Sequence, residues 1–223
     1  MARKQLPETY RYYMLNKPAG CVSACRDAQH PTVLDCFPPE ERAGLFPMGR
    51  LDKNSVGILL ITDDGKLNRR LLAPENHIEK QYQVWAVGKI SQEKLNLLQN
   101  GIVVKGLQQP LKAQSVRMLK QEKLCDIPVP IFENRKSLLM EQPELSVCCL
   151  EIILTEGKRH EIKRLLEAIG CMAVALKRIS FAGIALDEAL LPGTYRNITE
   201  QERMLLLSLG QNANASNSRG VNR

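Results

Sequence analysis

The segment Gly49–Thr62 limits the fold most, because it places charged residues directly before an apolar run. Asp52 lies two residues after Arg50 and just before Lys53, and the apolar run 57–62 begins at a glycine. An apolar run this short, bounded by glycine and turn residues, is typical of a buried strand. A carboxylate beside such a strand is costly unless it has a partner or a chemical task. Asp52 is therefore the first candidate for chemistry, although a lone polar residue before a strand is more often a turn residue.

The composition indicates a globular protein with a polyanionic partner. The 223 residues are 44% hydrophobic and 25% charged, which is ordinary for a chain with a packed core. The net charge of +7 favours nucleic acid as the partner, although many equally basic proteins bind none. Aromatic residues make up only 4%, so we do not expect a binding surface built from stacked rings.

Several protein classes are disfavoured by the sequence. There is no run of about 18 apolar residues, the length that a membrane span requires, and residues 1–8 lack the apolar stretch of a secretory signal. The seven cysteines are odd in number and include no C-x-x-C pair, so neither a disulfide framework nor a zinc site is predicted. We therefore expect a cytoplasmic protein with reduced thiols, no metal and no contact with a membrane.

Short predicted strands alternate with a few predicted helices. The stretch 80–87 alternates polar and apolar residues, which indicates a strand with one buried face. Ser91 is a favourable helix cap, and Thr199 with Glu202 forms a capping box that opens another short helix. The predicted strands are 10–16, 57–62, 80–87, 102–104, 112–119, 147–154 and 173–181, and the other predicted helices are 67–72, 91–99 and 160–169.

Two segments differ in character from the rest of the chain. Residues 121–145 contain three prolines and mixed charges, which indicates an inserted excursion between two strands. Residues 210–223 are polar and low in complexity, which predicts a disordered tail.

The predicted helix 160–169 gathers basic residues around its first turn. Its apolar residues recur at i, i+3, i+4 and i+7, which defines a buried face and places Lys163 on the flank of that face. The first turn of a helix offers free N–H groups that suit phosphates. Alone, this pattern is more often a solvated amphipathic helix. The basic residues of this region are Lys158, Arg159, His160, Lys163 and Arg164.

Three segments in order carry a resemblance to a known family. They are Asn-Lys-Pro-Ala-Gly at 16–20, Gly-Arg-Leu-Asp at 49–52 with the run that follows it to residue 65, and Glu-Gly-Lys-Arg-His-Glu-Ile-Lys-Arg at 156–164. Together they resemble the RsuA-type branch of the ribosomal RNA pseudouridine synthases. Residues 80–84 and 191–196 also fit, so the resemblance covers residues 10–205. Each motif alone is weak, whereas four or more in order are specific.

The resemblance implies a fold and a reaction. The implied fold is α+β, the pseudouridine synthase fold, with a central mixed, mostly antiparallel sheet and flanking helices. Residues 1–209 would form the catalytic domain, with two subdomains around one active-site cleft. The implied reaction breaks the bond between ribose and uracil nitrogen, turns the base and rejoins it through carbon 5. Because this is an isomerisation, it needs no cofactor.

The resemblance also assigns roles to residues at matching positions. Asp52 matches the catalytic carboxylate, which attacks either the base or the ribose, and Lys163 matches its basic partner. Tyr82 matches the tyrosine that lies against the target base, where its hydroxyl can assist removal of the proton from carbon 5. Arg50 matches an arginine linked to flipping the nucleotide out of its stack. Leu165 matches a residue that packs beneath the base.

Other basic residues are candidates for contacts with RNA. Cations near the site position a nucleic acid through its phosphates, while most cations on any surface only aid solubility. The candidates, each with a surface role as its alternative, are Lys17, Lys158, Arg159, His160, Arg164, Lys177 and Arg178.

The substrate implied by the resemblance is a specific uridine of ribosomal RNA. The combination of His160 with Lys163 and Arg164 favours the small-subunit (16S) enzymes over large-subunit (23S) relatives, and the partner would be ribosomal RNA or a ribosomal-subunit precursor, bound by a monomer. Only residues 1–9 precede the first predicted strand, so we expect the separate N-terminal RNA-binding domain of many relatives to be absent. The alternatives are another RNA target or a non-catalytic ribosome-assembly factor, and the retention of Asp52 and Lys163 argues against the latter.

Overall fold

The computed structural model describes residues 10–217 except residue 105, and side chains as far as residue 210. In this part of the chain nine strands form one sheet, and five α-helices and four short 3-10 helices flank it. The strands are β1 (Tyr12–Lys17), β2 (Phe46–Pro47), β3 (Val56–Thr62), β4 (Lys80–Val87), β5 (Ser115–Lys123), β6 (Ser146–Leu154), β7 (Met172–Phe181), β8 (Ile184–Ala185) and β9 (Tyr195–Asn197). The helices are α1 (Gly65–Leu72), α2 (Gln92–Asn100), α3 (Lys136–Glu141), α4 (Glu161–Ala168) and α5 (Glu200–Asn217), with 3-10 helices at Val33–Cys36, Pro74–Asn76, Leu124–Asp126 and Glu133–Arg135.

The sheet is mixed and mostly antiparallel, as predicted. Its order is β5-β6-β4-β7-β3-β1-β9, with β2 beside β3 and β8 beside β7. Among the described strands the only parallel neighbours are β3 and β7. The predicted α+β class is therefore confirmed.

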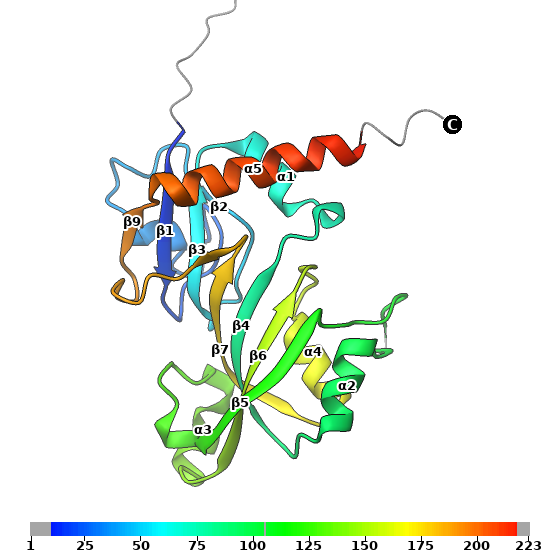
Figure 1. Ribbon diagram of the computed structural model, residues 1–223. Helices are drawn as coiled ribbons and strands as arrows, with labels where there is room; N and C mark the ends of the chain where they lie inside the picture. The colour runs from blue at the N-terminus through cyan, green and yellow to red at the C-terminus, as the bar shows by residue number, and fades with distance from the viewer. Residues whose placement is uncertain (1–9, 105, 218–223) are drawn as a thin grey trace, which may run out of the picture.

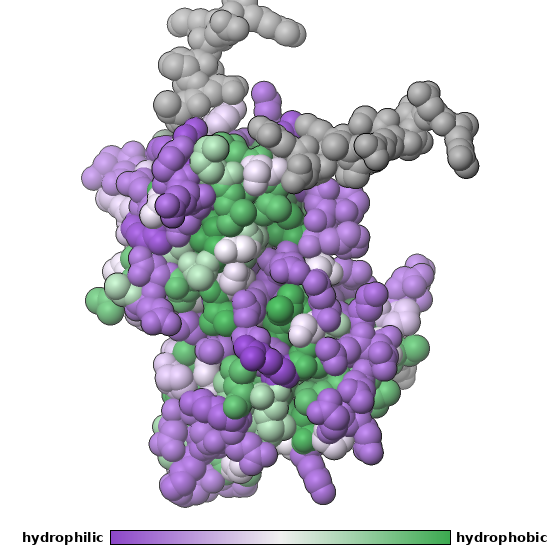
Figure 2. All heavy atoms as spheres, viewed as in Figure 1, coloured by the Kyte–Doolittle hydropathy of each residue, from purple (hydrophilic) through white to green (hydrophobic). Residues whose placement is uncertain are grey.

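The apolar core divides between two halves of this sheet. Figure 1 shows one half built on β1, β3 and β9 with α1 and α5, and another built on β4–β7 with α2, α3 and α4. Each half has its own buried clusters, one on either face of the sheet. Figure 2 shows hydrophilic residues around a central strip of hydrophobic ones on the viewed face. The division into two subdomains around one cleft stays a prediction.

Strand β4 is covered on the face that its sequence pattern predicts to be polar. β4 has the predicted bounds, but Trp85 on its predicted polar face is only 1% exposed. Apolar residues from the predicted excursion 121–145 pack on this face, although its first three residues belong to β5, so the excursion begins at residue 124. The Trp85 indole donates to Glu122 of β5 at 2.7 Å. Both faces of β4 are thus buried. The predicted strand 102–104 is wrong, because only Ile102 forms an isolated bridge there.

The last helix is longer than predicted. Thr199 and Glu202 form the expected capping box, with hydrogen bonds of 2.7 and 3.2 Å. From this nucleus α5 continues to Asn217, into the segment that we predicted to be disordered from residue 210. Once a helix has started, adding a further turn costs little, and two alanines of this segment favour it. The prediction for residues 218–223 lies outside the described residues.

Gly57 brings the two halves of the sheet into contact. It pairs with Arg178 where β3 meets β7, and its φ of +104° is one that L side chains rarely adopt. A Cβ at this position would lie 2.2 Å from the Arg178 carbonyl oxygen. Because that neighbour is backbone, no rotamer change relieves the overlap. The glycine that begins the apolar run is therefore required for the contact between β3 and β7.

We predict that Gly57→Ala destabilises the fold more than Gly101→Ala does. The two glycines have φ of +104° and +103°, but a methyl at Gly101 would meet nothing closer than 3.6 Å. Backbone strain of about 1–3 kcal/mol is common to both variants, and only Gly57→Ala adds a backbone overlap. Urea unfolding of both variants measures the difference. Equal losses of unfolding free energy would show that β3 and β7 tolerate a wider spacing.

Candidate active site

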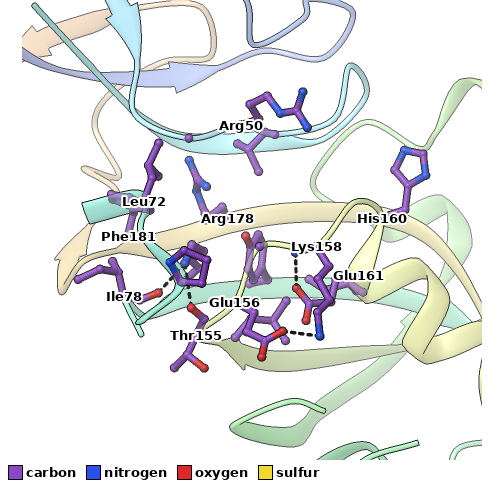
Figure 3. A pocket seen from close by; sticks show the side chains of 18 of the residues that line it. Arg50, Leu72, Ile78, Thr155, Glu156, Lys158, His160, Glu161, Arg178 and Phe181 are labelled. Carbon is purple, nitrogen blue, oxygen red and sulfur yellow. Dashed lines mark hydrogen bonds and ion pairs between the residues drawn. The ribbon is translucent and has the colours of Figure 1, made fainter. Parts of the chain in front are cut away.

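A cavity of about 990 Å³ is lined by residues of both halves of the sheet. The loop before β3, the start of β4, the end of β7 and the first turn of α4 all contribute side chains (Figure 3). Its size falls within the range of pockets that hold small molecules or single nucleotides. The sequence-predicted residues Arg50, Asp52, Tyr82 and Lys163 all line it.

Asp52 forms a close ion pair at the wall of this cavity. Its Oδ2 lies 2.6 Å from the Lys163 ammonium, and the two side chains are 34% and 27% exposed. His160 Nε2 lies 3.6 Å from Oδ1 of the same carboxylate. His160 directly precedes α4 and has a left-handed φ of +54°, which is uncommon for a residue other than glycine. The structure thus brings together two segments that are 111 residues apart in the sequence.

Lys163 is held on its other side by Phe132. The ammonium lies 4.5 Å from the centre of the Phe132 ring, within range of a cation–π interaction. Phe132 is buried and comes from the excursion 121–145, and its backbone N–H donates to Val174 on β7 at 2.8 Å. The excursion therefore reaches the candidate site through this ring. The sequence gives no sign of this role for Phe132, because a single aromatic residue between two prolines shows no periodicity.

Hydrogen bonds from the N-terminal segment hold the loop that carries Asp52. The Lys17 ammonium donates to three backbone carbonyls, those of Pro18, Lys53 and Ser55, at 2.9–3.1 Å. Ser23 Oγ donates to Leu51 and accepts from its N–H, at 2.9 and 3.0 Å. The backbone on both sides of Asp52 is therefore tied to the N-terminal segment.

This arrangement corrects our prediction for Lys17. Its side chain is fully buried, at 0% exposure, so it cannot contact RNA phosphates as predicted. A buried ammonium needs acceptors, and the three loop carbonyls supply them. Lys17 is a structural residue beneath the site.

Two further predicted residues are buried. Leu165 belongs to the core cluster that includes Tyr82 and does not line the described cavity, so its place beneath the base stays a prediction. Arg178 is buried and faces the cavity, so its predicted contact with phosphate at the surface is wrong. Arg164 and Lys177 are half-buried and line neither described cavity.

The remaining predicted cations surround a second, smaller hollow. This hollow measures about 360 Å³ and is lined by Asp52 and by four basic residues, Arg50, Lys158, Arg159 and His160. All but Lys158 are exposed, and the Lys158 ammonium pairs with Glu156 at 2.6 Å. We call these four residues the basic rim.

Buried polar groups deeper in the cavity were not singled out by sequence analysis. The Lys80 ammonium donates to the carbonyls of Ile78 and Thr155 at 2.6 and 3.3 Å, and burial lowers its pKa to about 8. Glu161 accepts from the Lys158 backbone N–H at 3.0 Å, and burial raises its pKa (Figure 3). Both belong to motifs of the resemblance, but their burial was not evident from the pattern. Among the described residues, no three His, Cys, Asp or Glu side chains are grouped to hold a metal.

Comparison with known proteins decides the family. A family model described as RNA pseudouridylate synthase matches residues 11–168 of the 223. The chain belongs to this family. It is 37% identical over 206 residues to the uncharacterized RNA pseudouridine synthase YtzG of Bacillus subtilis, across 90% of this chain and 76% of that relative. The predicted enzyme class, an isomerase that forms pseudouridine in RNA, is therefore confirmed.

Other members of the family show the same likeness. The chain is 34% identical to ribosomal small subunit pseudouridine synthase A of Pseudomonas aeruginosa, over 86% of this chain and 72% of that one. A crystal structure of a pseudouridylate synthase matches with a TM-score of 0.70 and 30% identity, over 89% of this chain and 74% of that chain. No helix in the described part of the chain has the length and apolar character to cross a membrane.

The burial of Lys17 predicts a pH dependence of stability. Burial lowers the pKa of Lys17 from 10.5 to about 8, so between these values the unfolded chain binds more protons than the folded chain. Stability attributable to Lys17 should therefore be lowest below pH 8 and rise as pH increases toward 10.5, by at most about 1.4 kcal/mol per pH unit.

The matched comparison for this prediction is Lys17→Met. Neighbouring ionisable groups, among them Cys21, Cys36 and Asp52, remain in both proteins, so the difference between the two reports Lys17 together with its charge coupling to these groups. Urea unfolding from pH 7 to 10 should show the wild type gaining stability relative to the variant above pH 8. A difference that stays constant over this range would contradict the assignment.

Proposed function

We propose that this enzyme converts a uridine of small-subunit ribosomal RNA to pseudouridine, with Asp52 as the catalytic carboxylate. The observation that supports this most is the ion pair of 2.6 Å between Asp52 and Lys163 at the wall of the main cavity. The pair is partly exposed, so a substrate entering the cavity can reach the carboxylate. Lys163 balances its charge and orients it through the charge-assisted hydrogen bond.

The cavity suits a flipped-out uridine. Leaving a base stack costs a few kcal/mol, and contacts in the enzyme must offset this. The exposed Arg50 borders both the main cavity and the smaller hollow, where it can bind phosphate or fill the space left by the nucleotide. Tyr82 lies inside the main cavity, where its ring can pack against uracil.

Tyr82 is also the candidate for proton transfer at carbon 5. Burial raises the pKa of its hydroxyl, and the nearby Arg178 guanidinium opposes that rise. A phenol is a weak base near neutral pH, so it needs such a cation to accept a proton. Asp52 would make the covalent attack, and the bond it forms would break again as carbon 5 joins the ribose, which restores the carboxylate. Tyr82 would accept the proton that leaves carbon 5 or help to move it.

The proposed substrate rests on the basic rim and on the relatives. The rim residues supply cations for RNA phosphates, which fix the register of the strand without reading its sequence. The relatives from Pseudomonas aeruginosa and Escherichia coli carry names that assign them to the small ribosomal subunit. We also propose that the enzyme acts in the cytoplasm as a monomer, on ribosomal RNA or a subunit precursor.

We predict that Asp52→Asn abolishes pseudouridine formation while leaving the fold intact. Asparagine has the same shape but lacks the charge and the nucleophilic oxygen, so kcat should fall by at least about 10³-fold. Pseudouridine mapping of total RNA from cells that carry each variant, together with assays on small-subunit RNA, measures the loss. The exposed Asp126 of the excursion provides a matched control, Asp126→Asn, which should keep full activity.

Two results would contradict the proposal in different ways. An unchanged modification map in Asp52→Asn cells would exclude Asp52 as the catalytic residue. A map in which the lost pseudouridine lies outside small-subunit RNA would retain the catalytic assignment and overturn the substrate.

A further inference from the structure

Arg178 is a buried cation at the point where three strands meet. It pairs with Tyr82 of β4 on one side and with Gly57 of β3 on the other. Its side chain is 1% exposed and lines the main cavity (Figure 3). Its Nε donates to the Ile58 carbonyl at 2.8 Å, and its Cζ lies 5.0 Å from the centre of the Phe181 ring. These contacts hold the guanidinium in one orientation.

The guanidinium has an unused donor. Its Nη2 is buried and finds no hydrogen-bond partner in the described part of the chain. Buried polar groups are almost always satisfied, so an exception beside a cavity indicates a ligand. A buried guanidinium also usually faces a carboxylate, yet none of the described carboxylates forms an ion pair with Arg178. The Tyr82 hydroxyl lies close to the guanidinium but carries no charge while it is protonated. The free Nη2 donor and the missing negative charge therefore point to a ligand in the cavity.

An irregularity in the sheet places this donor in the cavity. Arg178 and Phe181 are three residues apart, so in a regular strand their side chains would point to opposite faces. The register of β4 against β7 shifts between Gln81 and Tyr82, which pair with Ser180 and Arg178 and leave Ile179 unpaired. Arg178 and Phe181 therefore share the face of Tyr82. Bulges of this kind commonly re-aim a side chain next to an active site.

We propose that Arg178 Nη2 binds a carbonyl oxygen of the target uracil and stabilises the negative charge of the ring during glycosidic bond cleavage. The inference rests on the proposed function. When the bond from uracil nitrogen 1 to ribose breaks, its electron pair stays on the ring and spreads onto the carbonyl oxygens. Carbon 5 then forms the new bond to ribose and loses its proton, and nitrogen 1 gains one, so no oxidant or other co-reactant is needed.

The position of Arg178 fits this role better than a contact with phosphate. The exposed cations of the basic rim lie where the RNA backbone enters, whereas Arg178 lies at the inner wall with Tyr82. A fixed donor acts strongly on charge that develops in the transition state. Such a donor raises kcat rather than lowering KM.

The test compares Arg178→Met and Arg178→Lys with the wild type on small-subunit RNA. Arg178→Met removes a buried charge without an ion-pair partner, together with its hydrogen bond to the Ile58 carbonyl, so the variant should fold with a modestly lowered unfolding temperature. Its kcat should fall about 10²–10³-fold with KM nearly unchanged. Arg178→Lys keeps the charge but cannot contact both the Ile58 carbonyl and the substrate, so it should give an intermediate kcat. The exposed Arg117 provides a control, Arg117→Met, which should keep wild-type kinetics.

A second arm separates contact with uracil from a purely structural role. The target uridine is replaced by 2-thiouridine or 4-thiouridine, because sulfur accepts hydrogen bonds poorly. If Nη2 binds O2, 2-thiouridine should slow the wild type more than it slows Arg178→Lys; if Nη2 binds O4, 4-thiouridine should do so. The substitution whose effect depends on Arg178 therefore identifies the oxygen that is bound. Equal effects of both thio substitutions on both proteins, or a raised KM at wild-type kcat, would overturn the inference. Wild-type activity on unmodified RNA tests the proposed function separately.

Discussion

The site depends on the close contact between β3 and β7. Gly57 allows the two backbones to meet, and Arg178 extends the contact by donating to the next carbonyl along β3. The loop that carries Asp52 leads directly into β3, while α4, which carries Lys163, leads into β7. The same contact therefore fixes the distance between the carboxylate and the ammonium. A change that separates β3 from β7 would disturb the ion pair without touching either charged residue.

Three cations near the cavity donate to backbone carbonyls rather than to carboxylates. Lys17, Lys80 and Arg178 are buried or half-buried beneath the site, and each donates to backbone carbonyls. Carbonyl groups satisfy N–H donors but carry no net charge, so these hydrogen bonds leave the positive charge in place. Among the described residues, none of the three forms an ion pair with a carboxylate. The resulting positive potential favours an anionic RNA strand and any charge that develops on its base.

Much of the site could be predicted from the sequence, because local patterns carried the information. The helical period placed Lys163 on the flank of the core face of α4, which is where it meets Asp52. The exposure of Lys17 and Arg178 could not be predicted in this way. A cation is buried only where carbonyls from distant segments surround it, and those of Lys53, Ser55 and Ile58 come together only in the folded chain. The β-bulge opposite Tyr82 likewise has no signature in the sequence.

The central claim is that Asp52 and Lys163 act as one unit, and a double-mutant cycle tests it most directly. The rate of pseudouridine formation would be measured under single-turnover conditions for Lys163→Met, Asp52→Asn and the double variant. We expect Lys163→Met to lower the rate by about 10²-fold in the wild type and to have no further effect in the Asp52→Asn background. If the two losses multiplied, the residues would act independently, and this account of the site would be contradicted.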